Sequence, residues 1–234
     1  MRLCVLYSGG KDSNLALLKA VESGHEIACL LSLKPVSAES EVFHFPNVEL
    51  TEMQAEAIGV PLISVECGDR EDESLKALRE GLERAKELGA EGVVTGAIRS
   101  TYQASRFQRI CYSLDLWCFN PLWLRDEVSI LREVVERGFE TVIVRVAGID
   151  RRFLGANLKD VLRELSEMKG YANPAGEGGE YETLVLDMPL FRKRIVIEEF
   201  EVVGGTGEDE DVRGAMGVMD AVMVVKKARL VPKR

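Results

Sequence analysis

The sequence predicts an α/β protein in which a Rossmann-like, parallel five-stranded sheet with helices on both faces is followed by a smaller α+β domain. Three observations support this prediction. Short apolar runs alternate with amphipathic stretches through the first half, glycines follow the amphipathic stretches, and the pattern changes after Pro121. A repeated strand, helix, strand order favours right-handed crossovers and a parallel sheet.

The predicted strands of the first half are apolar runs that are continuous rather than alternating. Continuous runs are typical of strands that helices bury on both faces. The runs cover residues 3–7, 27–33, 62–65, 92–95 and 116–119.

The predicted helices lie between these runs, where apolar residues recur at helical spacing. Such spacing gives a helix one apolar face to place against a sheet. Two of these sets are Leu75, Leu78, Leu82 and Ala85, and Leu50, Met53 and Ala57. Glycine is favoured just after a helix, and Gly24, Gly59 and Gly89 occupy such positions.

A second domain is predicted from the changed pattern after Pro121. Helices are expected over residues 126–137 and around Leu158 to Met168, with a strand at 141–146 between them. Further strands are expected at 183–186, 195–203 and 221–225. The boundary is placed near residue 122, which gives domains 1–122 and 123–234.

Charge and composition narrow the classes of partner. Of the 234 residues, 30 are basic and 39 acidic, and the net charge of −9 disfavours a nucleic-acid partner because such binding depends on clustered Lys and Arg. No run approaches the roughly 20 apolar residues of a membrane span, so no membrane partner is expected. The basic C-terminal residues and the acidic run at 208–211 are interpreted as solvated chain ends. The basic residues are Lys226, Lys227, Arg229, Lys233 and Arg234.

The five cysteines are odd in number and form no C-x-x-C pair. Neither a disulfide framework nor a four-cysteine zinc site is therefore expected. Most lie in or beside apolar runs, which is typical of reduced, buried thiols and favours a cytoplasmic location. The oligomeric state stays open, a homo-oligomer included.

A glycine-rich loop, Ser-Gly-Gly-Lys-Asp-Ser at residues 8–13, lies between the first predicted strand and a helix. Backbone N–H groups and the positive end of the helix dipole meet there and favour anions. Lys11 supplies positive charge, Ser8 and Ser13 supply hydroxyl donors, and Asp12 is a candidate ligand for Mg²⁺. A simple helix cap after a glycine turn explains Asp12 or Ser13 but not the whole loop.

A second unusual segment, Gly-Glu-Gly-Gly-Glu-Tyr-Glu-Thr, occupies residues 176–183 just before an apolar strand. A glycine turn leading into a strand explains the glycines alone. It leaves three carboxylates at the entrance of a strand unexplained.

Residues 8–13 resemble the S-G-G-x-D-S loop of the N-type ATP pyrophosphatases, and the Walker A pattern is absent. Combined with residues 176–183, the chain resembles the diphthine–ammonia ligase family through most of its length. Matching segments include Phe43-His44, Gln54-Ala55-Glu56-Ala57, Gly96-Ala97-Ile98, Pro121-Leu122-Trp123 and Asp187-Met188-Pro189. Thr101 departs from the pattern, because we expect an acidic residue before the Tyr102-Gln103 pair. The resemblance fades after about residue 203.

The resemblance implies a HUP-type fold, with an ATP-binding domain followed by a substrate-binding domain. The implied reaction amidates the carboxylate of diphthine on translation elongation factor 2, using ATP and ammonium. It passes through an acyl-adenylate and releases AMP and pyrophosphate.

The residues expected at the site fall into three groups. Catalytic roles go to Lys11, Asp12 and Glu180, and ATP-binding roles to Ser8, Gly9, Gly10, Lys11, Asp12, Ser13 and Gly96. Substrate-binding roles go to His44, Arg99, Tyr102, Gln103, Arg106, Glu177, Gly178, Gly179, Glu180, Tyr181 and Glu182.

Several alternatives remain open on the sequence. His44 suits a structural role as well as a ligand-binding one, and Arg99 and Arg106 suit an ordinary surface. Trp117 and Trp123 are expected in the core. The rival functions are a tRNA-modifying enzyme with the same loop, of the thiolation or lysidine type, and a non-catalytic nucleotide-binding protein.

Overall fold

The computed structural model describes residues 1–35, 47–68, 70–168, 170, 172–204 and 220–233. Its contacts divide the chain into two units. One comprises Met1–Leu124 and Leu190–Arg192, and the other comprises Arg125–Pro189 and Lys193–Arg234.

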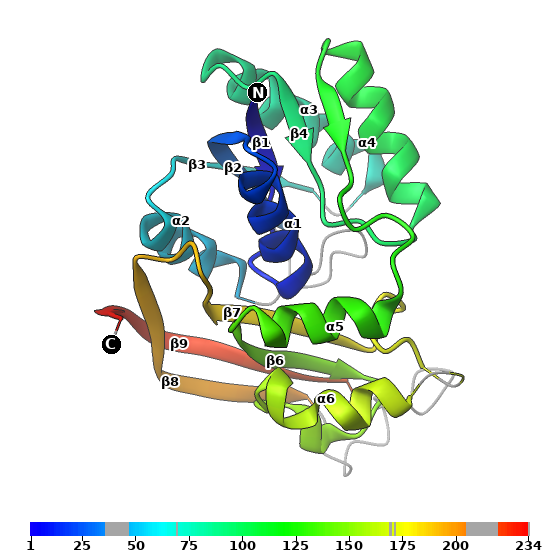
Figure 1. The fold of residues 1–234 in the computed structure, drawn as a ribbon, viewed down its shortest axis with the longest axis vertical. Helices are drawn as coiled ribbons and strands as arrows, with labels where there is room; N and C mark the ends of the chain where they lie inside the picture. Colours follow the sequence, from blue (N-terminus) through cyan, green and yellow to red (C-terminus); the bar gives the residue numbers. More distant parts are fainter. Residues whose placement is uncertain (36–46, 69, 169, 171, 205–219, 234) are drawn as a thin grey trace. The chain divides into compact units, whose positions relative to one another are not determined.

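The first unit contains the parallel five-stranded sheet that the sequence predicts (Figure 1). Its strands run in the order β3-β2-β1-β4-β5, so that β1 lies at the centre and β3 and β5 form the two edges. They are β1 (Arg2–Leu6), β2 (Glu26–Pro35), β3 (Leu62–Cys67), β4 (Gly92–Val94) and β5 (Trp117–Phe119). Continuous apolar runs located all of them, and burial on both faces accounts for this pattern in the three central strands β2, β1 and β4.

The helices of this unit are α1 (Lys11–Glu22), α2 (Thr51–Ile58), α3 (Glu71–Glu87) and α4 (Thr101–Ser113), and a short 3₁₀ turn, η1 (Val48–Leu50), precedes α2. Apolar residues of α3 and α4 share one core cluster with Cys4 of β1. Leu3 and Val5, which alternate with Cys4, are 0% exposed, and α1 contacts β1, β2 and β4. Helices on both faces are therefore confirmed. Gly24, Gly59 and Gly89 end the helical stretches with φ of +81°, +85° and +84°, as predicted.

The second unit is an α+β arrangement, also as predicted. Its antiparallel sheet has the order β7-β6-β9-β8. The strands are β6 (Glu140–Ala147), β7 (Tyr181–Asp187), β8 (Lys193–Gly204) and β9 (Asp220–Pro232). Helices α5 (Glu127–Glu136) and α6 (Leu158–Glu167) contact each other, α6 contacts β6, and η2 (Arg151–Phe153) is a short 3₁₀ turn. Asp126 and Asn157 cap α5 and α6 by accepting hydrogen bonds from Ser129 N and Lys159 N.

The chain returns once to the first unit between β7 and β8. Arg192 N–H donates to the carbonyl of Ala57, near the end of α2, at 2.6 Å. This short return, Leu190–Arg192, has no compositional signal, and the sequence-based division at residue 122 did not include it.

Two interpretations of the sequence were wrong. Lys226, Lys227 and Arg229 do not form a chain end, because β9 carries them beside glutamates of β8, although their side chains are exposed to solvent. Lys226 pairs with Glu201, and Lys227 and Arg229 pair with Glu198. Cross-strand ion pairs allow such a charged segment to form a strand. The acidic run at 208–211 lies outside the described residues.

Trp117 is not a core residue, since it is 67% exposed. It begins β5, which is an edge strand, so only one neighbouring strand covers it. All five cysteines are free, and four of them, Cys4, Cys29, Cys67 and Cys111, are buried as predicted. Among the described helices, none has the length and apolar character needed to cross a membrane.

Candidate functional site

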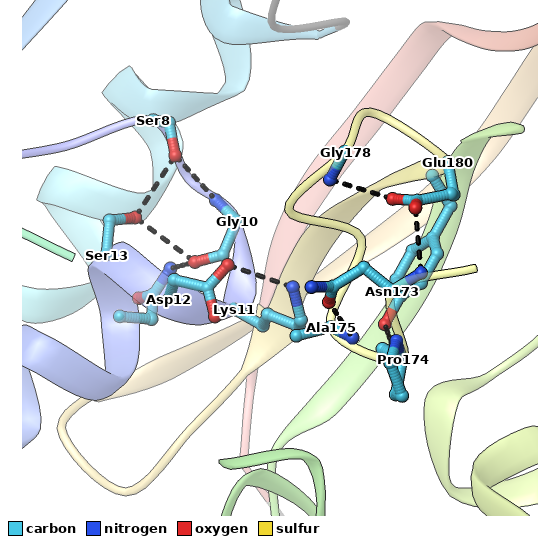
Figure 2. Close-up of polar contacts among 12 residues, drawn as sticks. Ser8, Gly10, Lys11, Asp12, Ser13, Asn173, Pro174, Ala175, Gly178 and Glu180 are labelled. Atoms are coloured by element: carbon cyan, nitrogen blue, oxygen red, sulfur yellow. Dashed lines mark hydrogen bonds and ion pairs between the residues drawn. The ribbon is translucent and has the colours of Figure 1, made fainter. Parts of the chain in front are cut away.

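The glycine loop lies where β1 ends and α1 begins (Figure 2). Gly10 is the N-cap of α1, and no side chain caps the helix there. The first N–H groups of a helix have no partner within the helix, and the helix dipole places partial positive charge beside them. The end of the loop is therefore a site for an anion.

Two serine hydroxyls lie together at this helix start. Ser8 Oγ is 3.3 Å from Ser13 Oγ, and Gly10 N–H donates to Ser8 Oγ at 3.4 Å. Ser13 Oγ also donates to the carbonyl of Gly10 at 3.1 Å. The structure thus brings together the hydroxyls that the sequence assigns to phosphate binding.

Lys11 and Asp12 form the first turn of α1 and contact each other. Lys11 Nζ is 2.9 Å from Asp12 Oδ2. Lys11 is 3% exposed, and both residues belong to the helix rather than to the loop before it. A buried lysine needs a charge partner, and the Asp12 carboxylate supplies one here.

The other oxygen of Asp12 is relevant to the predicted magnesium. Asp12 Oδ1 is buried and has no hydrogen-bond partner among the described residues. Mg²⁺ is often held by one or two carboxylates together with substrate phosphates, and this oxygen fits such a role. The described part of the chain contains no group of three or more His, Cys, Asp or Glu side chains suited to a metal.

Asn14 supports the loop from within α1 and was not identified from the sequence. It is 0% exposed, its Nδ2 donates to the Gly10 carbonyl at 2.9 Å, and its Oδ1 accepts from Tyr7 Oη at 2.7 Å. Burial raises the pKa of Tyr7 well above its usual value, although the bond to Asn14 acts in the opposite direction. Tyr7 is therefore a stable neutral donor that fixes the Asn14 amide.

Gln54 supports the loop from α2. Its Nε2 donates to the Gly9 carbonyl at 3.0 Å, and the residue is 0% exposed. Sequence reasoning noted Gln54 only as part of a matching segment. No local pattern relates it to a loop so far away in the chain.

Gly96 lies against the start of α1. A Cβ at this position would be 2.8 Å from the Asp12 carbonyl carbon and 2.9 Å from Ser13 N. Both neighbours are backbone atoms, so only glycine allows this close approach. The predicted contact of Gly96 with ATP stays a prediction, and packing against the loop is its observed role.

The substrate-binding residues predicted in the first unit are not brought together around the loop in the part of the chain that the structure describes. Arg99 is exposed, and Arg106 pairs with Glu71 at the start of α3. His44 lies outside the described residues, as do the side chains of Tyr102 and Gln103. Thr101 is the exposed first residue of α4. The substrate-binding roles of these residues stay predictions.

In the second unit, Glu180 organises the glycine-rich loop before β7 (Figure 2). Its Oε1 accepts from Asn173 N–H at 2.7 Å and its Oε2 accepts from Gly178 N–H at 2.8 Å. Tyr181 Oη donates to the carbonyl of Pro174 at 2.6 Å, and the residue is 2% exposed. Whether they also contact substrate is untested, but their observed contacts hold the loop in shape.

The remaining acidic residues of this loop lie nearer the solvent. Glu177 and Gly178 are exposed, and Gly179 has φ of +83°. Glu182 lies opposite Arg145 in the β6–β7 register. The hydrogen bond to Asp220 is the main cause that raises the pKa of Arg145, and the charge of Glu182 adds to it. Glu177 is therefore the carboxylate most accessible to a ligand.

Two family models match the chain and together cover both units. The model described as the diphthamide synthase N-terminal domain matches residues 1–117, and the model of the C-terminal domain matches residues 126–214. The chain belongs to the diphthamide synthase family. The predicted resemblance is thereby confirmed.

Curated relatives of this family are similar over most of the chain. Proteins named diphthine–ammonia ligase from Danio rerio and Homo sapiens are 35% and 34% identical over 227 and 230 residues. The match covers 87% of this chain in both cases, and 89% and 85% of those proteins. The relative of the same name from Schizosaccharomyces pombe is 35% identical, but the chain spans only 37% of its length.

Proposed function

We propose that this family member amidates the carboxylate of diphthine on translation elongation factor 2, with ATP and ammonium as the other substrates. The observation that carries the proposal is the Ser-Gly-Gly-Lys-Asp-Ser loop at the start of α1. It places an anion site at the strand end of a chain whose curated relatives are named diphthine–ammonia ligase.

The first step is adenylation of the acceptor. A carboxylate oxygen attacks the α-phosphorus of ATP, the bond to the bridging oxygen breaks, and pyrophosphate leaves with the electron pair. Negative charge grows on the leaving group, and Lys11, the Ser8 and Ser13 hydroxyls and the α1 N-terminus stabilise it. Binding both reactants in line supplies much of the remaining acceleration.

Magnesium is proposed as the resident metal. Asp12 Oδ1, which is buried and has no partner among the described residues, would hold it. When bound, the ion neutralises phosphate charge. Lys11 stays paired with Asp12 Oδ2, so the carboxylate is positioned before ATP arrives.

The second step is amide formation. Ammonium loses a proton to water, and ammonia attacks the acyl carbon. The bond from that carbon to the oxygen bridging it to phosphorus breaks, AMP leaves with this oxygen, and the added nitrogen loses a second proton to water. Carboxylates favour both ammonium and the trimethylammonium group of diphthine. We assign the exposed Glu177 to this attraction and Glu180 to the shape of the loop that presents it.

The test combines the protein with ATP, ammonium and diphthine-bearing elongation factor. Mass spectrometry should show conversion of the acid to the amide, with AMP and pyrophosphate as products. A heavy oxygen isotope in the diphthine carboxylate should appear in AMP, because the carboxylate oxygen bonds to phosphorus in the acyl-adenylate. Elongation factor without diphthine is the control.

Other outcomes would favour the rival functions. ADP as the sole nucleotide product would contradict the adenylation step. Turnover that requires tRNA would favour a tRNA-modifying enzyme. ATP binding without turnover by authentic acceptor would favour a nucleotide sensor. A cytoplasmic location is part of the proposal and is checked by fractionation of cells.

A further inference from the structure

The carbonyl of Gly9 is held by a residue that lies outside the phosphate loop. The first carbonyl that accepts a hydrogen bond within α1 is that of the N-cap, Gly10, which accepts from Asn14 N. The Gly9 carbonyl lies one residue earlier and therefore has no partner within the helix. Gln54 Nε2 on α2 donates to this carbonyl at 3.0 Å, and Gln54 is 0% exposed. A buried carbonyl that lacks a donor is costly, so Gln54 supplies a bond that the helix does not.

This hydrogen bond fixes the direction of the neighbouring amide. In a trans peptide the carbonyl and the N–H point to opposite sides, and the described chain has no cis peptide. With Gly9 O directed to Gln54, Gly10 N–H faces the other side of the loop. There it lies 3.4 Å from Ser8 Oγ, which is 3.3 Å from Ser13 Oγ (Figure 2). One amide and two hydroxyls thus share the side that suits an anion.

The Gln54 amide packs so closely against Gly9 that no side chain fits at position 9. Gly9 has φ of +83°, and a Cβ there would lie 2.6 Å from Gln54 Oε1. A side chain at position 9 would therefore be strained and would also push the amide away. The first glycine of the loop is required where Gln54 approaches.

We propose that Gln54 is a positioning residue for ATP. It holds the Gly9–Gly10 peptide so that Gly10 N–H, which donates to Ser8 Oγ, is directed before the nucleotide binds to the side of the loop where the two serine hydroxyls lie. This inference rests on the proposed binding of ATP by the loop. It adds a residue on α2 to a site that the sequence placed at the start of α1 and at Gly96, and it makes the loop preorganised rather than adaptable.

The first test replaces Gln54 with Met, which keeps the length of the side chain and removes the donor. The matched control is Gln108→Met, at an exposed position of α4. Inorganic pyrophosphate is the probe, titrated calorimetrically against each folded protein. We expect Gln54→Met to weaken pyrophosphate binding about tenfold and the control to leave it unchanged, because one amide donor loses its orientation.

Kinetics separates positioning from a merely structural role. We expect Gln54→Met to raise the KM for ATP about tenfold while the KM for the elongation factor stays the same. A merely structural role would reduce the folded fraction, which lowers kcat and Tm without changing the KM for ATP. Gln54→Glu, which keeps the shape but cannot donate when ionised, should also raise the KM for ATP and serves if Gln54→Met does not fold.

The outcomes separate this inference from the proposed function. Wild-type pyrophosphate affinity and KM for ATP in both folded variants would overturn the role of Gln54 and leave the function intact. Pyrophosphate binding that weakens as expected, in a protein that does not amidate diphthine, would support Gln54 and contradict the function. A wild-type protein that binds neither pyrophosphate nor ATP would overturn both.

Discussion

The two glycine-rich loops use their polar side chains in opposite ways. In the loop at residues 8–13, Gln54 and Asn14 donate to the carbonyls of Gly9 and Gly10. In the loop before β7, Glu180 accepts from two backbone N–H groups. The side chains of the first arrangement occupy backbone carbonyls, whereas the side chain of the second occupies backbone amide donors.

This difference matches the charges of the proposed ligands. The N-terminus of α1 and Lys11 suit the polyphosphate of ATP, which is anionic. In the second loop Glu180 occupies two of the N–H groups that an anion would need, and the exposed Glu177 suits ammonium or trimethylammonium. Both loops are rich in glycine, so composition alone does not reveal which charge each prefers. The hydrogen bonds that shape them do.

The largest loss of activity is expected when the negative charge of Asp12, in the first loop, is removed. Asp12→Asn keeps the shape of the side chain but removes the negative charge beside Lys11 and the proposed metal ligand. We expect kcat/KM for amidation to fall about a hundredfold or more, because an electrostatic contact at the reacting phosphates is lost. Steady-state release of pyrophosphate measures this.

Asp72→Asn is the matched control, because Asp72 also lies in the first turn of a helix of the same unit and its side chain is 72% exposed. Its activity should equal that of the wild type. An Asp12→Asn variant with normal turnover would exclude Asp12 from the catalytic machinery.

The next largest effect, on Tm and on the KM for elongation factor, is expected from a change of Glu180 in the second loop. Glu180→Gln replaces one carboxylate oxygen by a donor that faces a backbone N–H, of Asn173 or of Gly178. One amide then lacks an acceptor, which costs about 1–3 kcal/mol where it is buried. We expect a lower Tm and a KM for elongation factor about tenfold higher, with the KM for ATP unchanged.

Glu177→Gln sharpens this comparison, since it removes a charge from the same loop without touching those hydrogen bonds. It should raise the KM for elongation factor and lower Tm less than Glu180→Gln does. Equal losses of ATP and acceptor affinity in Glu180→Gln would show that the two loops do not divide the ligands as proposed.

A smaller effect is expected at Gly96, which packs against α1. In Gly96→Ala the new Cβ meets backbone of Asp12 and Ser13 within 3.0 Å, so the start of α1 or the β4–α4 connection must move. Overpacking of this kind costs about 1–3 kcal/mol. We expect a lower Tm and a KM for ATP that rises about threefold to fivefold, in proportion to a partial shift of the loop.

The control for Gly96→Ala is Gly24→Asn at the other end of α1. Gly24 has open space around it, and Asn tolerates its φ of +81° better than other side chains do. This variant should leave the KM for ATP unchanged. A rise in both variants would mean that any disturbance of α1 affects the site, and that contact with Gly96 is not specific.

The sequence predicted those parts of the fold and the site whose pattern lies within a short stretch of consecutive residues. The apolar runs of the first half located every strand of the parallel sheet, because burial on both faces leaves a strong local pattern. The order strand, glycine turn, helix at residues 8–13 located the anion site for the same reason. The extent of β9 was missed, since its charges become acceptable only when β8 supplies Glu198 and Glu201.

The parts that the sequence did not predict depend on contacts with backbone. Gln54 binds the carbonyl of Gly9, a residue 45 positions away, and a carbonyl has no sequence signature. Glu180 looked like a ligand because it is acidic and lies among glycines, yet its oxygens accept from backbone N–H groups. A polar side chain that hydrogen-bonds to a backbone group far away in the sequence is identified only once the fold that brings the two together is known.

The smallest effect is expected from Tyr181→Phe, which tests whether an aromatic residue of the second loop contacts substrate or only supports the loop. The change removes the hydrogen bond to Pro174 O and keeps the buried ring, which is 2% exposed in the wild type. We expect the free energy of unfolding to fall by about 1 kcal/mol, with the KM for elongation factor unchanged. Tyr112→Phe, at a position 86% exposed, is the matched control and should change neither quantity. A raised KM for elongation factor in Tyr181→Phe alone would mean that its hydroxyl reaches the acceptor, and the second loop would then use Tyr181 for the ligand as well as for its own backbone.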